Sequence, residues 1–94
     1  MKGLKYDEGK PDYTLVNKEL MDGIAQVMMF GASKYGRDNY RLFTKDDIGR
    51  FEAAALRHMF QHTSGELLDS QSGLPHIDHV GACLNILAYL RGLK

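Results

Sequence analysis

All four histidines of this sequence lie between positions 58 and 79, in the stretch RHMFQHTSGELLDSQSGLPHIDH, which also carries Glu66 and Asp69. Neutral imidazoles suit Zn²⁺ or Mn²⁺, whereas carboxylates are hard oxygen ligands that suit Mg²⁺. A histidine whose pKa is near the ordinary value of about 6.5 also transfers protons at neutral pH. The stretch is therefore a candidate metal or acid–base site.

The same residues allow two other interpretations. Acids and hydroxyls cap helices and histidines bond to loop carbonyls, so the stretch could be a polar connection between two helices. Alternatively, His76, His79 and Cys83 share one helical face and suit Zn²⁺, although three ligands from one helix need a fourth from elsewhere. A lone cysteine is more often a small buried hydrophobe.

Three helices are expected to position these side chains, over residues 17–33, 44–63 and 74–91. The second begins with a capping box, in which a hydroxyl at Thr44 is followed three residues later by the carboxylate of Asp47. Pro75 suits the first turn of the third helix. No segment shows the alternation of a strand, so the expected fold is all-α.

The helical pattern also defines the domain. Residues 1–94 are too few for more than one domain, and the polar segment 1–15 is expected to be an extended arm. The apolar face of the first helix is broad, which indicates burial on more than one side. Gly81 costs about 1 kcal/mol inside a helix, which indicates close packing at that point.

The spacing of the histidines predicts that they meet in space. His58 and His62 fall in the last turns of the second helix, and His76 and His79 in the first turns of the third. Helices joined by a short loop pack antiparallel, so both pairs lie at one end of the hairpin. The loop between the helices brings Glu66 and Asp69 to the same end.

Composition limits the classes of function. Lysine and arginine number 12, as do aspartate and glutamate, so no basic excess predicts binding to a nucleic-acid polymer. A chain of 94 residues has a thin core, which favours a homo-oligomer. One cysteine, no signal-peptide pattern and no membrane-length apolar run predict a cytoplasmic protein without a membrane partner.

Two further stretches could bind a nucleotide. In FGASKYGRDNY, residues 30–40, the tyrosines could stack on a base, Lys34 and Arg37 could meet phosphate, and Asn39 could read a base edge. In KYDEGKPDY, residues 5–13, Lys10 could grip a phosphate. Each stretch has a simpler alternative, a helix C-terminus in the first case and a solvated tail in the second.

These three stretches, in this order, resemble a phage-associated family, the N-terminal domain of dATP/dGTP diphosphohydrolases. The family pattern opens with K-Y-D-x-G-K-P, continues with F-G-A-x-K-Y-G and a nearby Asn, and ends with R-H, G-E, an Asp, S-G and H-x-x-H. The resemblance spans almost the whole chain. The matching positions are Lys5, Tyr6, Asp7, Gly9, Lys10, Pro11, Phe30, Gly31, Ala32, Lys34, Tyr35, Gly36, Asn39, Arg57, His58, Gly65, Glu66, Asp69, Ser72, Gly73, His76 and His79.

The resemblance implies a nucleotide pyrophosphohydrolase, loosely like the MazG class, that releases pyrophosphate from purine (deoxy)nucleoside triphosphates with Mg²⁺ or Mn²⁺. The implied catalytic residues are His58, His79, Glu66 and Asp69, and the implied metal ligands are Glu66, Asp69 and His79. The implied nucleotide-binding residues are Lys5, Lys10, Lys34, Tyr35, Arg37, Asn39, Arg57 and His76. The sequence departs from the MazG class in its first helix, where only Glu19 and Asp22 supply carboxylates.

Three functions therefore compete. The first is a metal-dependent nucleotide diphosphohydrolase, located in the host cytosol if the chain is encoded by a phage. The second is a binding protein of the same fold that captures a nucleotide, such as a signalling nucleotide of host defence, without cleaving it. The third is a structural helical oligomer. An assay with nucleotides and Mg²⁺ or Mn²⁺ would distinguish them. Products indicate the first function, binding without products indicates the second, and neither result indicates the third.

Overall fold

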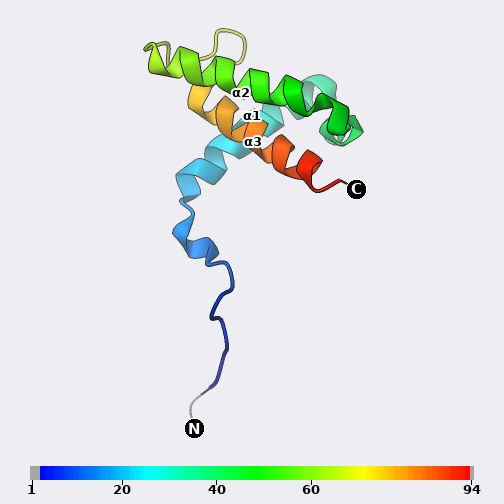
Figure 1. Ribbon diagram of the computed structural model, residues 1–94. Helices are drawn as coiled ribbons and strands as arrows, with labels where there is room; N and C mark the ends of the chain where they lie inside the picture. The colour runs from blue at the N-terminus through cyan, green and yellow to red at the C-terminus, as the bar shows by residue number, and fades with distance from the viewer. Residues whose placement is uncertain (1–2, 94) are drawn as a thin grey trace.

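The computed structural model describes residues 3–93, which form three α-helices and three short 3₁₀ turns. Among these residues there is no strand, so the expected all-α fold is confirmed. The helices make up the body of the molecule, and the N-terminal segment runs away from it (Figure 1). In chain order the elements are η1 Tyr13–Leu15, α1 Lys18–Tyr35, η2 Asn39–Leu42, η3 Lys45–Asp47, α2 Ile48–Thr63 and α3 His76–Arg91.

The helix ends follow the local sequence signals. Helix α1 stops at Gly36, whose φ of 97° lies in the region that favours glycine. The capping box from Thr44 to Asp47 is present, and the residues inside it form the 3₁₀ turn η3 before α2 begins. Pro75 precedes α3 as its N-cap, not within the first turn as expected, because its ψ of 137° is extended. Asn17 occupies the N-cap of α1 without a side-chain cap bond.

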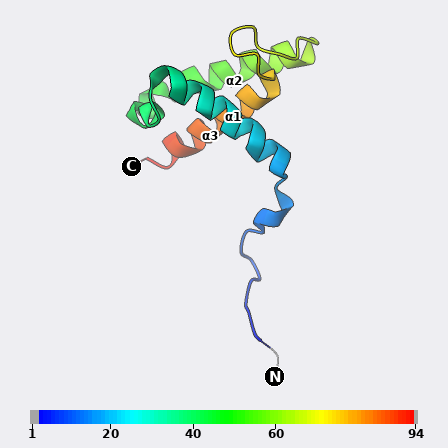
Figure 2. The ribbon, with the colours of Figure 1, turned by 180° about the vertical axis from the view of Figure 1, so that it is seen from behind.

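Helix α3 is the centre of the packing. It lies antiparallel to α2, and α1 crosses it on another side, as Figure 1 and the reverse view in Figure 2 show. The contact of the α2–α3 hairpin with α1 is made mainly by α3. The core is small, and its buried apolar side chains are Val27, Ala55, Val80, Ala82 and Leu90.

Two glycines allow α1 and α3 to approach closely. A Cβ at Gly23 would overlap the carboxylate of Asp78, and a Cβ at Gly81 would lie 2.8 Å from Cγ1 of Ile24. The close packing predicted at Gly81 is therefore confirmed. The crossing therefore places Gly23 and Ile24 of α1 against the first turns of α3.

The N-terminal arm has local order but little contact with the helices. The backbone N–H of Lys10 donates to the carbonyl of Asp7 at 3.0 Å. The side chain of Asp12 caps η1 by accepting the backbone N–H of Thr14. Tyr6 and Tyr13 are 81% and 80% exposed. The arm therefore leaves large apolar side chains uncovered.

Part of α1 is also open to solvent. Met21 and Met29 are exposed, so the second face of α1 that was expected to be buried is uncovered within residues 3–93. The homo-oligomer stays a prediction.

No helix in the described chain is long and apolar enough to cross a membrane.

A pair of glycine substitutions tests the crossing. Gly81→Ala should lower the free energy of unfolding, because overpacking costs about 1–3 kcal/mol and outweighs the gain of about 1 kcal/mol in helix propensity. Gly49→Ala should raise it, since a Cβ at Gly49 meets nothing within 4 Å. Urea denaturation measures both. Equal stabilisation by the two changes would contradict the close approach.

Candidate functional site

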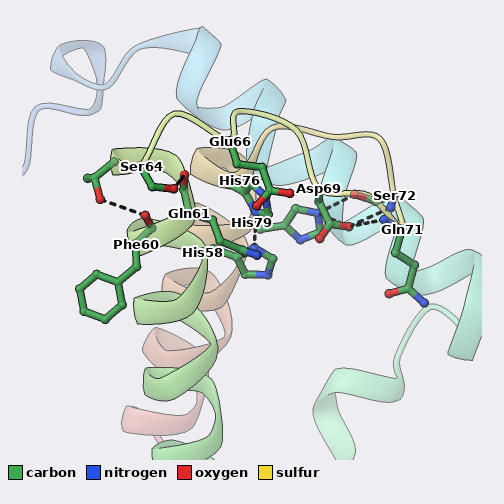
Figure 3. Close-up of polar contacts among 11 residues, drawn as sticks. His58, Phe60, Gln61, Ser64, Glu66, Asp69, Gln71, Ser72, His76 and His79 are labelled. Carbon is green, nitrogen blue, oxygen red and sulfur yellow. Dashed lines mark hydrogen bonds and ion pairs between the residues drawn. The ribbon is translucent and has the colours of Figure 1, made fainter.

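The loop over residues 64–75 folds back on itself between α2 and α3. The N–H of His76 donates to the carbonyl of Leu67, and the N–H of Asp69 donates to the carbonyl of Leu74, both at 2.8 Å. Gly65 and Gly73 supply backbone with positive φ at the two bends. This closed loop holds the side chains of Glu66 and Asp69 over the end of the hairpin (Figure 3).

The closest contact of the site joins the two helices. Nδ1 of His58 lies 2.8 Å from Nδ1 of His76, so one nitrogen carries the proton and the other accepts it. His76 is only 1% exposed. Within the described structure its Nε2 is buried without a hydrogen-bond partner, 3.7 Å from a carboxylate oxygen of Glu66. A buried imidazole with one unsatisfied nitrogen is unusual and calls for a functional explanation.

Asp69 connects the loop to the third histidine. One oxygen of its carboxylate accepts the backbone N–H of Ser72 at 2.8 Å and of Gln71 at 3.2 Å, and lies 3.8 Å from Nε2 of His79. The same Nε2 is 2.7 Å from the hydroxyl of Ser72. The ring of His79 stacks on His58, with centroids 4.5 Å apart and planes 11° from parallel. Asp69 therefore both closes the loop and faces the histidine cluster.

The electrostatics of the cluster favour neutral rings at His58 and His79 beside an ionised carboxylate at Asp69. Burial lowers the pKa of His58, and the neighbouring histidines lower it further. Burial also lowers the pKa of His79, and the nearby carboxylate of Asp69 only partly opposes this. For Asp69, burial raises the pKa, but the hydrogen bonds from Ser72 and Gln71 outweigh it and leave the pKa below its ordinary value. These are the protonation states that metal ligands and general bases need.

Among the described residues, one group can offer donor atoms to a single ion. One ligand atom each from His58, Asp69 and His76 lie within 4.8 Å of one another. The set expected from the sequence was Glu66, Asp69 and His79, which shares only Asp69 with this group. Glu66 and His79 lie beside it, next to His76 and Asp69 respectively.

The sequence predicts that His76 lies at the same end of the hairpin as His58, but it does not predict that His76 is buried or that it joins the donor group. His76 was assigned to nucleotide binding, whereas the fold buries it against His58. A signal was present, because His76 shares a helical face with Val80 and Leu90, and both are buried. A polar side chain on an apolar face needs a partner, and the partner here is another histidine.

A cavity of about 500 Å³ lies beside the cluster, between α1, η2, α2 and α3. Lys34, Arg37 and Arg50 are among its lining residues, and none of the described lining residues is Asp or Glu. His79 belongs to both the cavity wall and the cluster. The remaining lining residues are Val27, Met28, Phe30, Gly31, Ala32, Tyr35, Gly36, Asn39, Tyr40, Phe43, Phe51, Ala82, Cys83 and Ile86.

The structure thus gathers some of the expected nucleotide-binding residues and separates others. Lys34, Tyr35, Arg37 and Asn39 line the cavity. Lys5 and Lys10 lie in the arm, which runs away from the body in both Figure 1 and Figure 2. Arg57 lines a separate hollow along α2.

Two other sets of candidate ligands lie outside the cluster. The carboxylate of Asp22 in α1 pairs with Lys18 at 2.6 Å, and neither Glu19 nor Asp22 joins the group that can hold an ion. Cys83 lines the cavity, and burial raises the pKa of its thiol. Neither His79 nor Cys83 belongs to the group whose donor atoms lie within 4.8 Å of one another, so the alternative of His76, His79 and Cys83 gains no support.

Three helices and a closed loop define a small all-α domain with a polar site at one end of its hairpin. The family described as dATP/dGTP diphosphohydrolase, N-terminal, matches residues 1–92, and the chain belongs to this family. A protein of Salmonella phage PMBT28 named dATP/dGTP diphosphohydrolase is 30% identical over 90 residues. The match covers 96% of this chain and 30% of that protein, so the chain spans less than a third of its relative.

The comparisons confirm the family resemblance that the three motifs predicted. No solved structure matches the chain.

The lowered histidine pKa values predict how stability depends on pH. At pH values below 6.5, the ordinary pKa of histidine, His58 and His79 are protonated in the unfolded chain. They bind fewer protons in the folded chain, because their pKa values there are lower. Stability should therefore rise with pH through the window below about 7 and level off above it. Melting temperatures from pH 5 to 8, measured with a chelator present, test this. In the double variant His58→Gln/His79→Gln the rise should flatten; an unchanged slope would contradict the assignment.

Proposed function

We propose that this chain is the nucleotide-handling domain of a metal-dependent diphosphohydrolase that acts on purine (deoxy)nucleoside triphosphates. The observation that carries the proposal is the cavity, which three cationic side chains line without a described carboxylate, and which meets the histidine cluster at His79. In a chain with as many acids as bases, such a segregation of charge favours an anionic ligand. Its volume of about 500 Å³ suits a small-molecule ligand.

The cavity offers distinct partners to the parts of a nucleotide. Lys34 lies in the last turn of α1 and Arg37 just beyond its end, and both can neutralise phosphate oxygens. Tyr35 and Tyr40 present aromatic faces for a purine, and Asn39 can donate to and accept from a base edge. Arg50 is already paired with Asp47 at 3.1 Å, so less of its charge is available.

The histidine cluster supplies the groups that cleavage would need. Water attacks the α-phosphorus, the bond to the β-phosphate oxygen breaks, and pyrophosphate and a nucleoside monophosphate leave. Neutral His79, which also lines the cavity, can accept the proton of the attacking water. A divalent ion, when bound, would neutralise charge that develops on the phosphates. Asp69 and the imidazoles of His58 and His76 are the donors positioned to hold it, with Glu66 beside His76.

A second function is favoured by the low number of carboxylates. Glu19 and Asp22 do not join the cluster, and among the described carboxylates Glu66 and Asp69 are the two paired with its histidines. A domain with few acidic ligands could bind a nucleotide, such as a signalling nucleotide of host defence, without cleaving it. The two functions share the cavity and differ in chemistry.

The experiment that separates them is an incubation of the protein with a panel of nucleotides and Mg²⁺ or Mn²⁺. Release of pyrophosphate from dATP or dGTP supports the diphosphohydrolase. A rise in melting temperature without products supports the binding protein. If no nucleotide gives either result, both proposals fail.

Substitution of the two loop carboxylates should separate catalysis from stability. Glu66→Gln and Asp69→Asn should each abolish pyrophosphate release, because both acids adjoin the histidines. Only Asp69→Asn should lower the melting temperature, since Asp69 accepts two backbone bonds and losing such a cap costs about 0.5–2 kcal/mol. Activity and calorimetry on the same preparations test this. Reduced stability with intact activity would instead make the loop a mere helix connection.

Lys34 should contribute to nucleotide affinity. Lys34→Ala should weaken binding of a purine nucleoside triphosphate by about 1–3 kcal/mol, the range for a charge-assisted hydrogen bond. Lys45→Ala is the matched control, because Lys45 is exposed on η3 and outside the cavity lining. Isothermal titration calorimetry measures both. The phosphate assignment would be wrong if the two variants bound equally well.

A further inference from the structure

The two histidines at the helix contact are spaced as ligands of one ion. Two imidazole nitrogens that are each about 2.1 Å from a metal lie roughly 3 Å apart when the angle between them is near 90°. Nδ1 of His58 and Nδ1 of His76 are 2.8 Å apart. An ion in place of the shared proton would keep this separation, and each ring would turn its lone pair toward the ion.

A third donor lies at the same place. Asp69 contributes a carboxylate oxygen to the group in which all ligand atoms are within 4.8 Å of one another. The loop fixes this carboxylate through the N–H groups of Gln71 and Ser72. Three protein donors leave further coordination positions for water or a phosphate oxygen, which is the arrangement of a catalytic rather than a structural metal.

The unsatisfied nitrogen of His76 points to the same conclusion. If Nδ1 binds an ion, the ring proton must sit on Nε2, which is buried and faces the carboxylate of Glu66 at 3.7 Å. A carboxylate behind a metal-bound histidine is the usual outer-shell arrangement, because it fixes the tautomer and strengthens the ligand. A bound ion thus explains both the orphaned nitrogen and the position of Glu66.

His79 is placed for another role. Its Nε2 is engaged with the hydroxyl of Ser72 at 2.7 Å, and its ring stacks on His58. The stacking holds the plane of His58, while the edge of His79 reaches the cavity. His79 therefore orients a ligand of the ion and faces the nucleotide.

We infer that His58, His76 and Asp69 bind a first-row transition-metal ion such as Mn²⁺ or Co²⁺ in preference to Mg²⁺, with Glu66 in the outer shell. The preference follows from the donors, since imidazole nitrogen favours first-row transition metals over Mg²⁺, which selects oxygen ligands. The inference deepens the proposed function by naming its cofactor and ligands. Binding of the ion can be measured without nucleotide or turnover.

The test uses metal-free protein and MnCl₂, CoCl₂ or MgCl₂ alone. Mn²⁺ and Co²⁺ should raise the melting temperature with one ion bound per chain, and Mg²⁺ at equal concentration should have a much smaller effect. His58→Gln should weaken Mn²⁺ binding by at least roughly tenfold, and Glu66→Gln by roughly 10–100-fold as an outer-shell change. His62→Gln is the matched control, because His62 is four residues along α2 and outside the group. It should bind as the parent protein does.

The visible spectrum of the Co²⁺ form gives an independent measurement on folded protein. Its d–d bands should change in His58→Gln and remain unchanged in His62→Gln, with circular dichroism as the check on folding. Equal effects of Mg²⁺ and Mn²⁺, no binding of any ion, or equal losses in the two histidine variants would overturn the inference. Pyrophosphate release that needs only Mg²⁺ would overturn it too, and would leave the proposed function standing.

Discussion

The contact between His58 and His76 is the interaction on which the site depends. It joins the last turns of α2 to the first turn of α3, and one of its partners is almost completely buried. A buried polar ring must find partners or cost free energy, so the two histidines constrain how the helices slide along one another. The loop closes through the N–H of His76 and the backbone of Asp69. Both carboxylates of the site take their positions from that closure.

The crossing of α1 over α3 connects this cluster to the cavity. Gly23 and Gly81 remove the side chains that would hold the helices apart. Because α1 then runs close to α3, its C-terminal residues Lys34 and Tyr35 form a wall of the cavity, and His79 forms part of the facing wall. The proposed nucleotide site is therefore a consequence of helix packing, with cations from α1 and chemistry from α3.

Much of the fold could be predicted from the sequence, because the signals are local. The stop at Gly36, the capping box at Thr44 and the close packing at Gly81 depend on backbone conformation and small size, which single residues reveal. The predicted convergence at one end of the hairpin agrees with the structure for His58, His76 and His79, whereas His62 has no contact with this cluster among the described residues.

The composition of the site was harder to predict, because burial and approach are properties of the whole fold. The sequence does not show that His76 is buried against His58, or that Asp69 alone among the carboxylates joins them. It also does not show that Lys34 lines a cavity while Lys10, in an equally suggestive motif, lies in an arm away from it. These distinctions depend on contacts between segments far apart in the chain.

The most direct test of the account is a crystal structure of the protein with Mn²⁺ and a non-hydrolysable dATP analogue, with anomalous scattering to locate the metal. The account predicts one manganese peak among His58, His76 and Asp69, with the purine in the cavity and the phosphates between Lys34 and the metal. A metal bound only by carboxylates away from the histidines, or a nucleotide outside the cavity, would contradict it.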